Sequence, residues 1–359
     1  MVMATEDRYA AVRAAVSAHF TVREAWFQDG RPVFAIMPGP DDKAQFLRLR
    51  DDLAPLGVLP LLRQHDRETL VMLAPKPPAA TARWQLPVGL FVATLATTFA
   101  AGYLNASGSC IPGLVKPLTA GVEFSLSLMA ILVCHEMGHK IVSIRRGIDA
   151  SFPYFIPMVP IPGFAIGTMG AVILTRAPAP NRDALIELGA SGPIAGFLVA
   201  LPILMYGVAH SLVISHTAII ARGCHVTEIP TPRLLDMMVG WLLHPPITAE
   251  VLIHPMAFAG WVGLLVTALN LLPAGMLDGG HVTRAVFGPR LHLVLSFAAV
   301  VAGFLFGYWV MSLLILVLIR RGHPGPLDDV SPATPWHQLM AAALVGIFVL
   351  SAVPLATLW

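Results

Sequence analysis

The sequence has few charged residues for its length. Only 12% of its 359 residues are Lys, Arg, Asp or Glu, about half of the roughly 25% found in an average soluble protein. The deficit is uneven, because residues 1–83 hold 21 of the 44 charged residues and the remaining 276 residues share 23. With 56% apolar residues and a net charge of +2, the composition excludes a single soluble globule, a disordered chain and a nucleic-acid-binding protein.

Cysteine is scarce, and the first residues of the sequence do not form an apolar run. The three cysteines, Cys110, Cys134 and Cys224, have no spacing typical of a metal site or a disulfide framework. Cys134 falls within an apolar run, where packing is the expected role, whereas a disulfide between Cys110 and Cys224 stays open. The first residues include acidic and basic side chains, so we expect no signal peptide.

The charged N-terminal part has the pattern of a small folded domain. The order helix-strand-strand occurs twice, with helices expected at about 7–19 and 41–54 and strands at about 22–27, 32–37, 57–64 and 68–73. We predict an α+β domain over residues 1–74. A proline-rich linker follows over residues 75–83.

The rest of the chain, residues 84–359, is dominated by long apolar runs. About 20 apolar residues suffice to cross a bilayer, and such runs occur at about 85–105, 118–144, 184–209, 251–273, 291–319 and 338–357. The run at 291–319 is long for one crossing and short for two. The pattern therefore predicts a polytopic α-helical membrane protein with about six or seven transmembrane helices.

The arginines orient the chain in the membrane. Arg145 and Arg146 end the second run, Arg182 precedes the third, and Arg284 follows the fourth. All lie on one side if each of these runs crosses once, and positive residues mark the cytosolic side. We therefore expect residues 1–74 to lie in the cytosol.

One segment between the second and third runs is apolar but cannot be helical. Residues 152–163 contain four prolines, which a helix interior does not tolerate, and a strand-like run follows at 167–174. Non-helical backbone at membrane depth occurs only where protein buries it or where it lines a wet cavity. We predict a re-entrant β-hairpin or loop. The alternative is a loop lying on the lipid headgroups.

Two histidines four positions apart lie within the second run. His135 and His139 fall on one face of a helix, where both imidazoles can bind the same metal ion. Glu136 lies beside them and can accept a proton from a metal-activated water molecule. An ionisable residue at the centre of a span costs about 2.5–3.5 kcal/mol on insertion scales, and a divalent cation would offset that cost. A metal-free His–Glu cluster is the alternative.

A third ligand is expected, because catalytic zinc sites usually have three from the protein. Asp278 is the only acidic residue between Glu250 and Asp328, and it follows the end of an apolar run near Asn270. We expect Asp278 to complete a His₂Asp site. His281 could compete as a ligand, and it ranks second because Asp278 fits the motif whose family resemblance is given below.

The third run has features of a closely packed helix. Gly192 and Gly196 have the GxxxG spacing that lets helices approach closely in lipid. Glu187 lies near the cytosolic end of this run, and we expect its carboxylate to be solvated or paired.

The motifs His-Glu-x-x-His and Asn-x-x-Pro-x-x-x-Leu-Asp-Gly together resemble the site-2 protease family of intramembrane zinc metalloproteases. The resemblance covers about residues 119–290, and further segments are similar to the archaeal, cyanobacterial and plastid (EGY-like) branch. It implies that His135, His139 and Asp278 bind one zinc ion. It also implies that Glu136 activates the water molecule and that Asn270 helps to hold the substrate or the oxyanion.

The same resemblance implies an endopeptidase that cleaves transmembrane segments of single-span membrane proteins. The expected place is a prokaryotic cytoplasmic membrane, with the active site nearer the cytosolic face. Gly167, Thr168, Met169 and Gly170 would present a strand edge to unwound substrate. The alternative is a membrane metal-ion transporter that uses the same ligands, with Glu123 as a second binding position along the path of the ion. No oligomeric state is specified.

Overall fold

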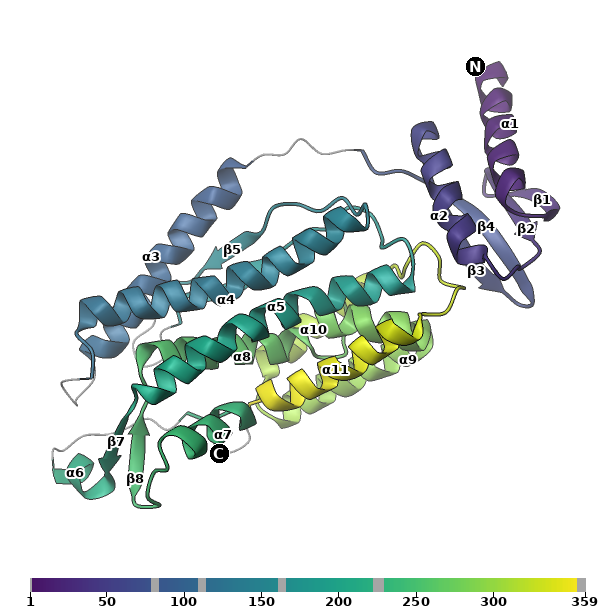
Figure 1. Ribbon diagram of the computed structural model, residues 1–359. Helices are drawn as coiled ribbons and strands as arrows, with labels where there is room; N and C mark the ends of the chain where they lie inside the picture. The colour runs from purple at the N-terminus through teal and green to yellow at the C-terminus, as the bar shows by residue number, and fades with distance from the viewer. Residues whose placement is uncertain (1, 79–83, 109–113, 161–165, 222–228, 354–359) are drawn as a thin grey trace.

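The chain forms a small N-terminal domain attached to one end of an elongated bundle of helices, as the computed structural model shows (Figure 1). The structure describes residues 2–78, 84–108, 114–160, 166–221 and 229–353. Cys110 and Cys224, and with them the open disulfide, lie outside the described residues. The same holds for residues 79–83 of the expected linker.

The N-terminal domain consists of two helices and a four-stranded antiparallel sheet. Its elements are α1 Val2–His19, β1 Val22–Gln28, β2 Arg31–Ile36, α2 Asp42–Leu53, the short helix Ala54–Leu56, β3 Val58–His65 and β4 Glu68–Pro75. The strand order is β1-β2-β4-β3, so the two helix-strand-strand units place their hairpins side by side. The order of elements that the sequence predicts is present here.

The core of this domain includes a residue from a distant part of the chain. Phe46 and Leu49 lie on one face of α2 and pack with Phe34 of β2 and Val71 of β4, all fully buried, as the spacing of an amphipathic helix requires. Leu327, which lies between the bundle helices α10 (Trp309–Arg321) and α11 (Pro335–Ser351), is 3% exposed and belongs to the same core. The domain therefore completes its core only against the bundle.

The remaining elements form the bundle and two small sheets. The helices are α3 Gln85–Ser107, α4 Pro117–Arg145, α5 Arg182–Ala209, α6 His216–Ala221, α7 Arg233–Leu242, α8 Pro255–Asn270, α9 Asp278–Leu305, α10 Trp309–Arg321 and α11 Pro335–Ser351. The sheets pair β5 Tyr154–Pro157 with β6 Thr168–Val172, and β7 Leu212–Ser215 with β8 Ala249–Leu252.

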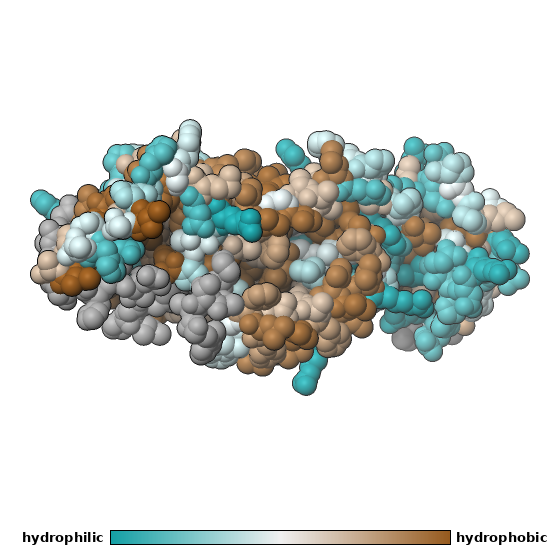
Figure 2. Space-filling model, turned by 90° about the horizontal axis from the view of Figure 1, so that it is seen from below, coloured by the Kyte–Doolittle hydropathy of each residue, from teal (hydrophilic) through white to brown (hydrophobic). Residues whose placement is uncertain are grey.

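The bundle has the apolar character of a membrane domain. Among the described residues, α3, α4, α5 and α9 are long and apolar enough to cross a membrane, by length and composition, and α8 and α11 are shorter apolar helices. Apolar side chains gather over the bundle, while hydrophilic ones cover the N-terminal domain (Figure 2). The two parts thus differ on their surfaces as the charge distribution predicts.

Two apolar runs are divided by breaks in the backbone. The run at 251–273 contains the end of β8 and the 16-residue helix α8. The run at 291–319 is split between α9 and α10, with Gly307 between them at φ 82°. Within α9, Gly288 has φ 78° and ψ −178° and interrupts the helix. Both breaks use backbone angles that glycine adopts without steric cost.

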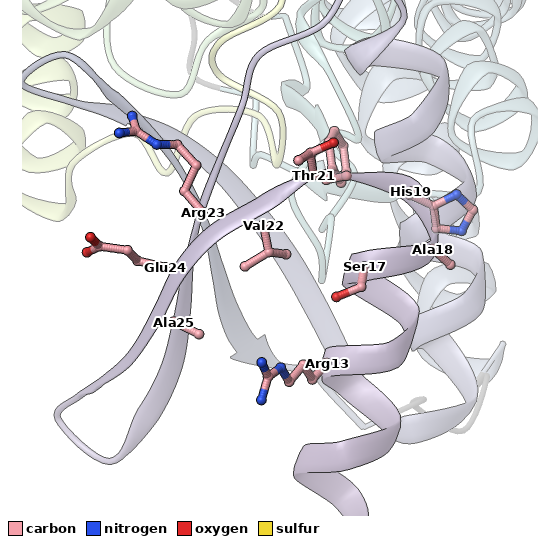
Figure 3. A pocket seen from close by; sticks show the side chains of 10 residues that line it. Arg13, Ser17, Ala18, His19, Thr21, Val22, Arg23, Glu24 and Ala25 are labelled. Carbon is pink, nitrogen blue, oxygen red and sulfur yellow. The ribbon is translucent and has the colours of Figure 1, made fainter.

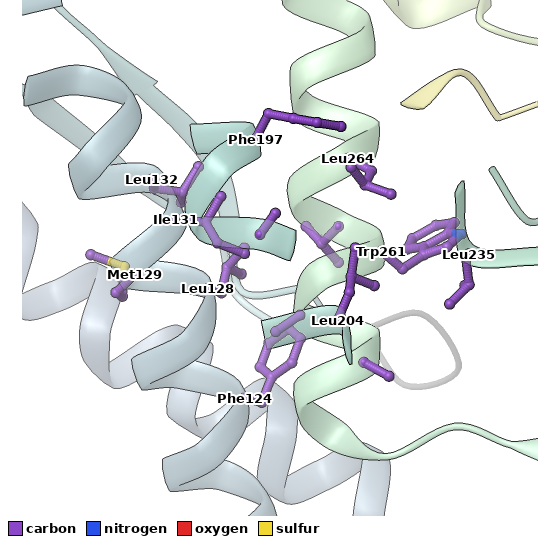
Figure 4. Close-up of a cluster of buried hydrophobic side chains, with 14 of the residues drawn as sticks. Phe124, Leu128, Met129, Ile131, Leu132, Phe197, Leu204, Leu235, Trp261 and Leu264 are labelled. Atoms are coloured by element: carbon purple, nitrogen blue, oxygen red, sulfur yellow. The ribbon is translucent and has the colours of Figure 1, made fainter. Parts of the chain in front are cut away.

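The centre of the bundle is formed by α4, α5 and α8. Phe124 and Leu128 of α4 pack with Leu204 of α5 and Trp261 of α8 in one buried cluster (Figure 4). Gly263 of α8 lies directly against the side chain of Ile131. Small residues at such crossings let helices approach closely in lipid.

The proline-rich segment forms part of a β-hairpin packed on α3. Tyr154 pairs with Val172 and Pro157 with Thr168 in antiparallel register. Thr97 of α3 donates a hydrogen bond of 2.6 Å to the carbonyl of Gly167, so this hairpin is held by the bundle. Residues 161–165 lie outside the described part.

The N-terminal domain is attached to the arginine-bearing end of the bundle, defined here by Arg146, Arg182 and Arg284. The Leu62 amide of β3 donates to the Leu327 carbonyl at 2.9 Å, and the Asp329 amide donates to the Leu62 carbonyl at 3.2 Å. The segment between α10 and α11 therefore extends the sheet at β3. The opposite end of the bundle carries α6, α7, β7 and β8 (Figure 1).

Candidate metal centre

Three predicted ligands from two helices converge at one point. His135 Nε2 lies 3.2 Å from Asp278 Oδ2, and His139 Nε2 lies 3.4 Å from Asp278 Oδ1. The two histidine Nε2 atoms are 3.2 Å apart. In the part of the chain that the structure describes, this is the one group of three such residues whose ligand atoms all lie within 4.8 Å of one another. The three side chains could therefore hold a single metal ion.

The hydrogen bonds around the cluster leave it suited to a cation. His139 Nδ1 donates to the Leu188 carbonyl at 2.7 Å, because a carbonyl oxygen can only accept. The neutral imidazole then presents an Nε2 lone pair to the carboxylate. Asp278 Oδ2 is buried and makes no hydrogen bond. Converging lone pairs and an orphaned carboxylate oxygen fit a divalent zinc ion with His₂Asp ligands.

Glycines of α5 make room for this cluster. A Cβ at Gly192 would overlap the His139 imidazole, and a Cβ at Gly196 would lie 3.2 Å from the side chain of His135. One turn earlier, a Cβ at Gly189 would lie against the Asp278 carbonyl. The predicted close packing at the GxxxG pair is present, and its function is to admit the ligand side chains.

Asp278 reaches the cluster because a tight turn joins α8 to α9. The turn includes Gly275 at φ 53°, and Cβ atoms at Gly279 and Gly280 would collide with carbonyl oxygens of the turn. These glycines thus pack the turn itself. Asp278 begins α9, where the positive end of the helix dipole favours a carboxylate.

The two predicted catalytic residues lie beside the ligands. Glu136 is 4% exposed, and its carboxylate is close enough to interact electrostatically with His135, His139 and Asp278. Asn270 ends α8, and its Nδ2 lies 3.4 Å from His135 Nε2. Asn270 therefore lies within contact distance of a ligand side chain, and Glu136 is buried next to His135 in the same helix.

Other candidates from the sequence are not part of this cluster. His281, ranked second as a ligand, has its Nδ1 2.8 Å from Nε2 of His323. Glu123, the possible second step of a transporter, pairs with His254 at 3.5 Å and lies twelve residues before His135, about 18 Å along the helix. Glu123 and His135, both on α4, therefore belong to two separate polar clusters.

The predicted substrate strand is mostly covered by the bundle. Gly167, Thr168 and Gly170 are buried, while Met169 is 70% exposed. A Cβ at Gly167 would overlap the backbone of Thr97, so this glycine serves the contact with α3. In the described residues, β6 pairs only with β5, which leaves its other edge without a strand.

Sequence reasoning missed the partners that hold the ligands from outside. The sequence gives no sign that the Leu188 carbonyl is a partner, because every residue has a backbone carbonyl. Glu187, expected to be solvated or paired, is paired with Arg146 and with His337 of α11. The sequence did not predict a role for His337. The one signal for it is its position at the polar beginning of an otherwise apolar helix.

One surface cavity lies away from this cluster. It has a volume of about 540 Å³ and lies between α1 and β1 of the N-terminal domain, with Arg13, Arg23 and Glu24 in its lining (Figure 3). His19 also lines it and has its Nε2 2.6 Å from Asp52 Oδ2. These side chains line a groove on the surface of the N-terminal domain and include no residue of the candidate metal centre.

The comparisons with known proteins agree with this arrangement. The model of peptidase family M50 matches residues 123–316, more than half of the chain. The probable zinc metalloprotease EGY1 of Arabidopsis thaliana chloroplasts is 26% identical over 311 residues, covering 77% of this chain and 54% of the relative. The probable zinc metalloprotease EGY2 of Oryza sativa subsp. indica chloroplasts is 29% identical over 219 residues, covering 59% and 38%. The chain thus spans about half the length, or less, of these curated relatives. No solved structure matches.

The first test of the site concerns the choice of its third ligand. We expect the purified wild type to bind one zinc ion per chain and Asp278→Ala to lose affinity by more than about a hundredfold, beyond the usual 10–100-fold cost of losing an outer partner. His281→Ala should keep the zinc content of the wild type, because His281 bonds to His323. Zinc content by elemental analysis and affinity by chelator competition measure this. Loss of zinc in His281→Ala alone would reverse the assignment.

The second test concerns the space at Gly192. Gly192→Ala should weaken zinc binding by roughly 10–100-fold, as for a displaced outer partner, because the added methyl group displaces the His139 imidazole. Gly346→Ala on α11 is the matched control, since a Cβ there meets nothing within 4 Å. Equal zinc affinity for both variants would show that α5 does not confine His139.

Proposed function

This chain belongs to peptidase family M50, and from that membership we propose that it is an intramembrane zinc endopeptidase. It would cleave transmembrane segments of single-span membrane proteins. The observation that carries the proposal is the convergence of His135, His139 and Asp278 from two apolar helices. A buried water-activating site within a membrane domain suits the hydrolysis of peptide bonds in membrane proteins.

The side chains around the cluster supply the remaining chemistry. When bound, zinc would polarise the scissile carbonyl and lower the pKa of a water molecule. Glu136 would accept the proton of that water and pass it to the departing amine nitrogen. Asn270, adjacent to His135, would donate its amide N–H to the oxygen on which negative charge develops. The burial of Glu136 supports this assignment, because it keeps bulk water from competing for the proton.

The substrate would bind as an extended segment beside β6. A helix has its carbonyls engaged in its own hydrogen bonds, so local unwinding has to precede cleavage. The free edge of β6, with Thr168 and Gly170 buried and Met169 exposed, supports binding by added-strand hydrogen bonds. Side chains of the bound segment would then alternate between protein and lipid.

The arrangement of the two parts supports a cytosolic N-terminal domain. This domain contacts the arginine-bearing end of the bundle, and positive residues mark the cytosolic side. His135 lies ten residues before Arg145, about 15 Å along α4, which supports an active site nearer that side. We propose six or seven crossings, as in a prokaryotic cytoplasmic membrane protein, drawn from α3, α4, α5, α8, α9, α10 and α11.

The activity is tested with detergent-purified protein and a single-span model substrate. We expect wild type to cleave it and Glu136→Gln to lose cleavage by roughly 10²–10⁴-fold, the usual contribution of general acid–base catalysis. Both proteins should contain zinc, because Glu136 is not among the expected ligands. Equal cleavage by both would rule out Glu136 as the base.

The strand-addition step has its own test. Met169→Pro removes one backbone N–H from β6 and restricts its backbone, so cleavage should be abolished while zinc stays bound. Met169→Ala is the control, since it keeps the N–H and removes only the exposed side chain. Cleavage by the proline variant at the wild-type rate would exclude this edge as the binding site.

A further inference from the structure

The orientation of His139 depends on the position of α5. Its Nδ1 donates to the Leu188 carbonyl at 2.7 Å, and this bond turns Nε2 toward Asp278. Outer partners of this kind orient a histidine ligand and tune its basicity. Whatever sets the position of Leu188 therefore also sets the geometry of the metal centre.

The neighbouring residue, Glu187, ties this part of α5 to two other helices. The Arg146 guanidinium, one residue beyond the end of α4, donates from Nε to Glu187 Oε2 at 2.5 Å and makes a second contact with Oε1. His337 Nε2 of α11 donates to Glu187 Oε1 at 2.8 Å. The hydrogen bonds from Arg146 to Glu187 raise the pKa of the guanidinium, so the Arg146 side of the pair stays charged.

The same network continues into the N-terminal domain. His337 Nδ1 lies 3.5 Å from Asp183 Oδ1 in the first turn of α5. Lys43 Nζ of α2 donates to Asp183 Oδ2 at 2.6 Å. Arg50 of α2 donates to the Arg146 carbonyl at 3.3 Å. One helix of the N-terminal domain thus contacts both ends of the network around Glu187.

A second connection reaches the helix that carries Asp278. Asp329, whose amide bonds to Leu62 of β3, accepts two hydrogen bonds from Arg284 at 3.0 and 2.6 Å. Arg284 lies six residues after Asp278 on α9. Its side chain is 5% exposed, and removing one partner of a buried charge pair is strongly destabilising because the other charge is left uncompensated. Arg182 of α5 lies 3.6 Å from the same carboxylate.

We propose that the N-terminal domain is a clamp for the metal centre, with Glu187, Asp183 and Asp329 as positioning residues that hold α5 and α9 where His139 and Asp278 meet. The inference rests on the proposed metal centre. The two connections hold different helices. The contacts of α2 hold α5, which carries the Leu188 carbonyl that orients His139, and the contacts of β3 hold α9, which carries Asp278. Loosening either one displaces a ligand without removing it.

The test measures ligand geometry directly, in the full-length protein. Cobalt replaces zinc, and its visible absorption bands report the geometry of the ligands. Zinc affinity is measured by competition with a chelator. The variants are Glu187→Gln, Asp329→Asn and Lys43→Ala, and Arg176→Ala is the control, because Arg176 forms a separate surface pair with Asp149.

We expect Glu187→Gln and Asp329→Asn to shift the cobalt bands and to weaken zinc binding by up to about tenfold. This is the lower end of the 10–100-fold cost of losing a direct outer partner, because neither side chain contacts a ligand. Lys43→Ala should shift the bands in the same direction, and Lys43→Arg should restore the wild-type spectrum. Lys43 lies in the N-terminal domain, so its variants keep the test valid if a bundle variant fails to fold. Arg176→Ala should match the wild type.

The outcomes separate this inference from the proposed function. Wild-type protein that binds no cobalt would overturn the metal centre and the clamp together. Wild-type binding with unchanged spectra and zinc affinities in Lys43→Ala and in the folded bundle variants would overturn the clamp alone. A shift in Lys43→Ala that Lys43→Arg does not reverse would also overturn it, because a charged donor at position 43 is the stated cause.

Discussion

The candidate metal centre depends on the glycines of α5, which have no side chain to occupy the space of the ligands. The His139 imidazole occupies the space that a side chain at position 192 would fill, and the backbone of Asp278 lies against Gly189. Helices in a membrane gain no hydrophobic energy from contacting one another, so close packing between small residues has to hold them together. Here that packing also creates the space for the ligands. The position of α5 between α4 and α9 is therefore the constraint from which the site follows.

The cost of placing polar groups in an apolar bundle explains how they are distributed. At the arginine-bearing end, Glu187, Asp183 and Asp329 all have basic partners. At the metal centre, Asp278 Oδ2 is buried beside two imidazoles and forms no hydrogen bond. Buried polar atoms without a partner are costly in a folded protein. A cation held by His135, His139 and Asp278 would offset this cost, whereas the ion pairs at the arginine-bearing end offset theirs within the protein.

The N-terminal domain is more than an attachment to the chain. Its sheet is extended by the segment before α11, and Leu327 from that segment completes its core. A domain of about 75 residues buries a smaller share of its surface than a larger one and is correspondingly marginal. Docking to the bundle adds to its stability. Through Lys43 and Asp329 it also links the domain to α5, which confines His139, and to α9, which carries Asp278.

The sequence by itself determined the order of elements in the N-terminal region and the apolar character of the rest, and it predicted His135, His139 and Asp278, which the structure brings together. These follow from local pattern: charge density, apolar periodicity, and the spacing of two histidines on one helical face. Only the tertiary structure decided that α5 confines His139, that the Leu188 carbonyl orients it, and that Lys43 and Arg50 reach the same network. Sequence pattern does not reveal these contacts, because a backbone carbonyl has no identity in sequence. Contacts between residues 49 to 140 positions apart depend on how the helices pack, which is a property of the whole bundle.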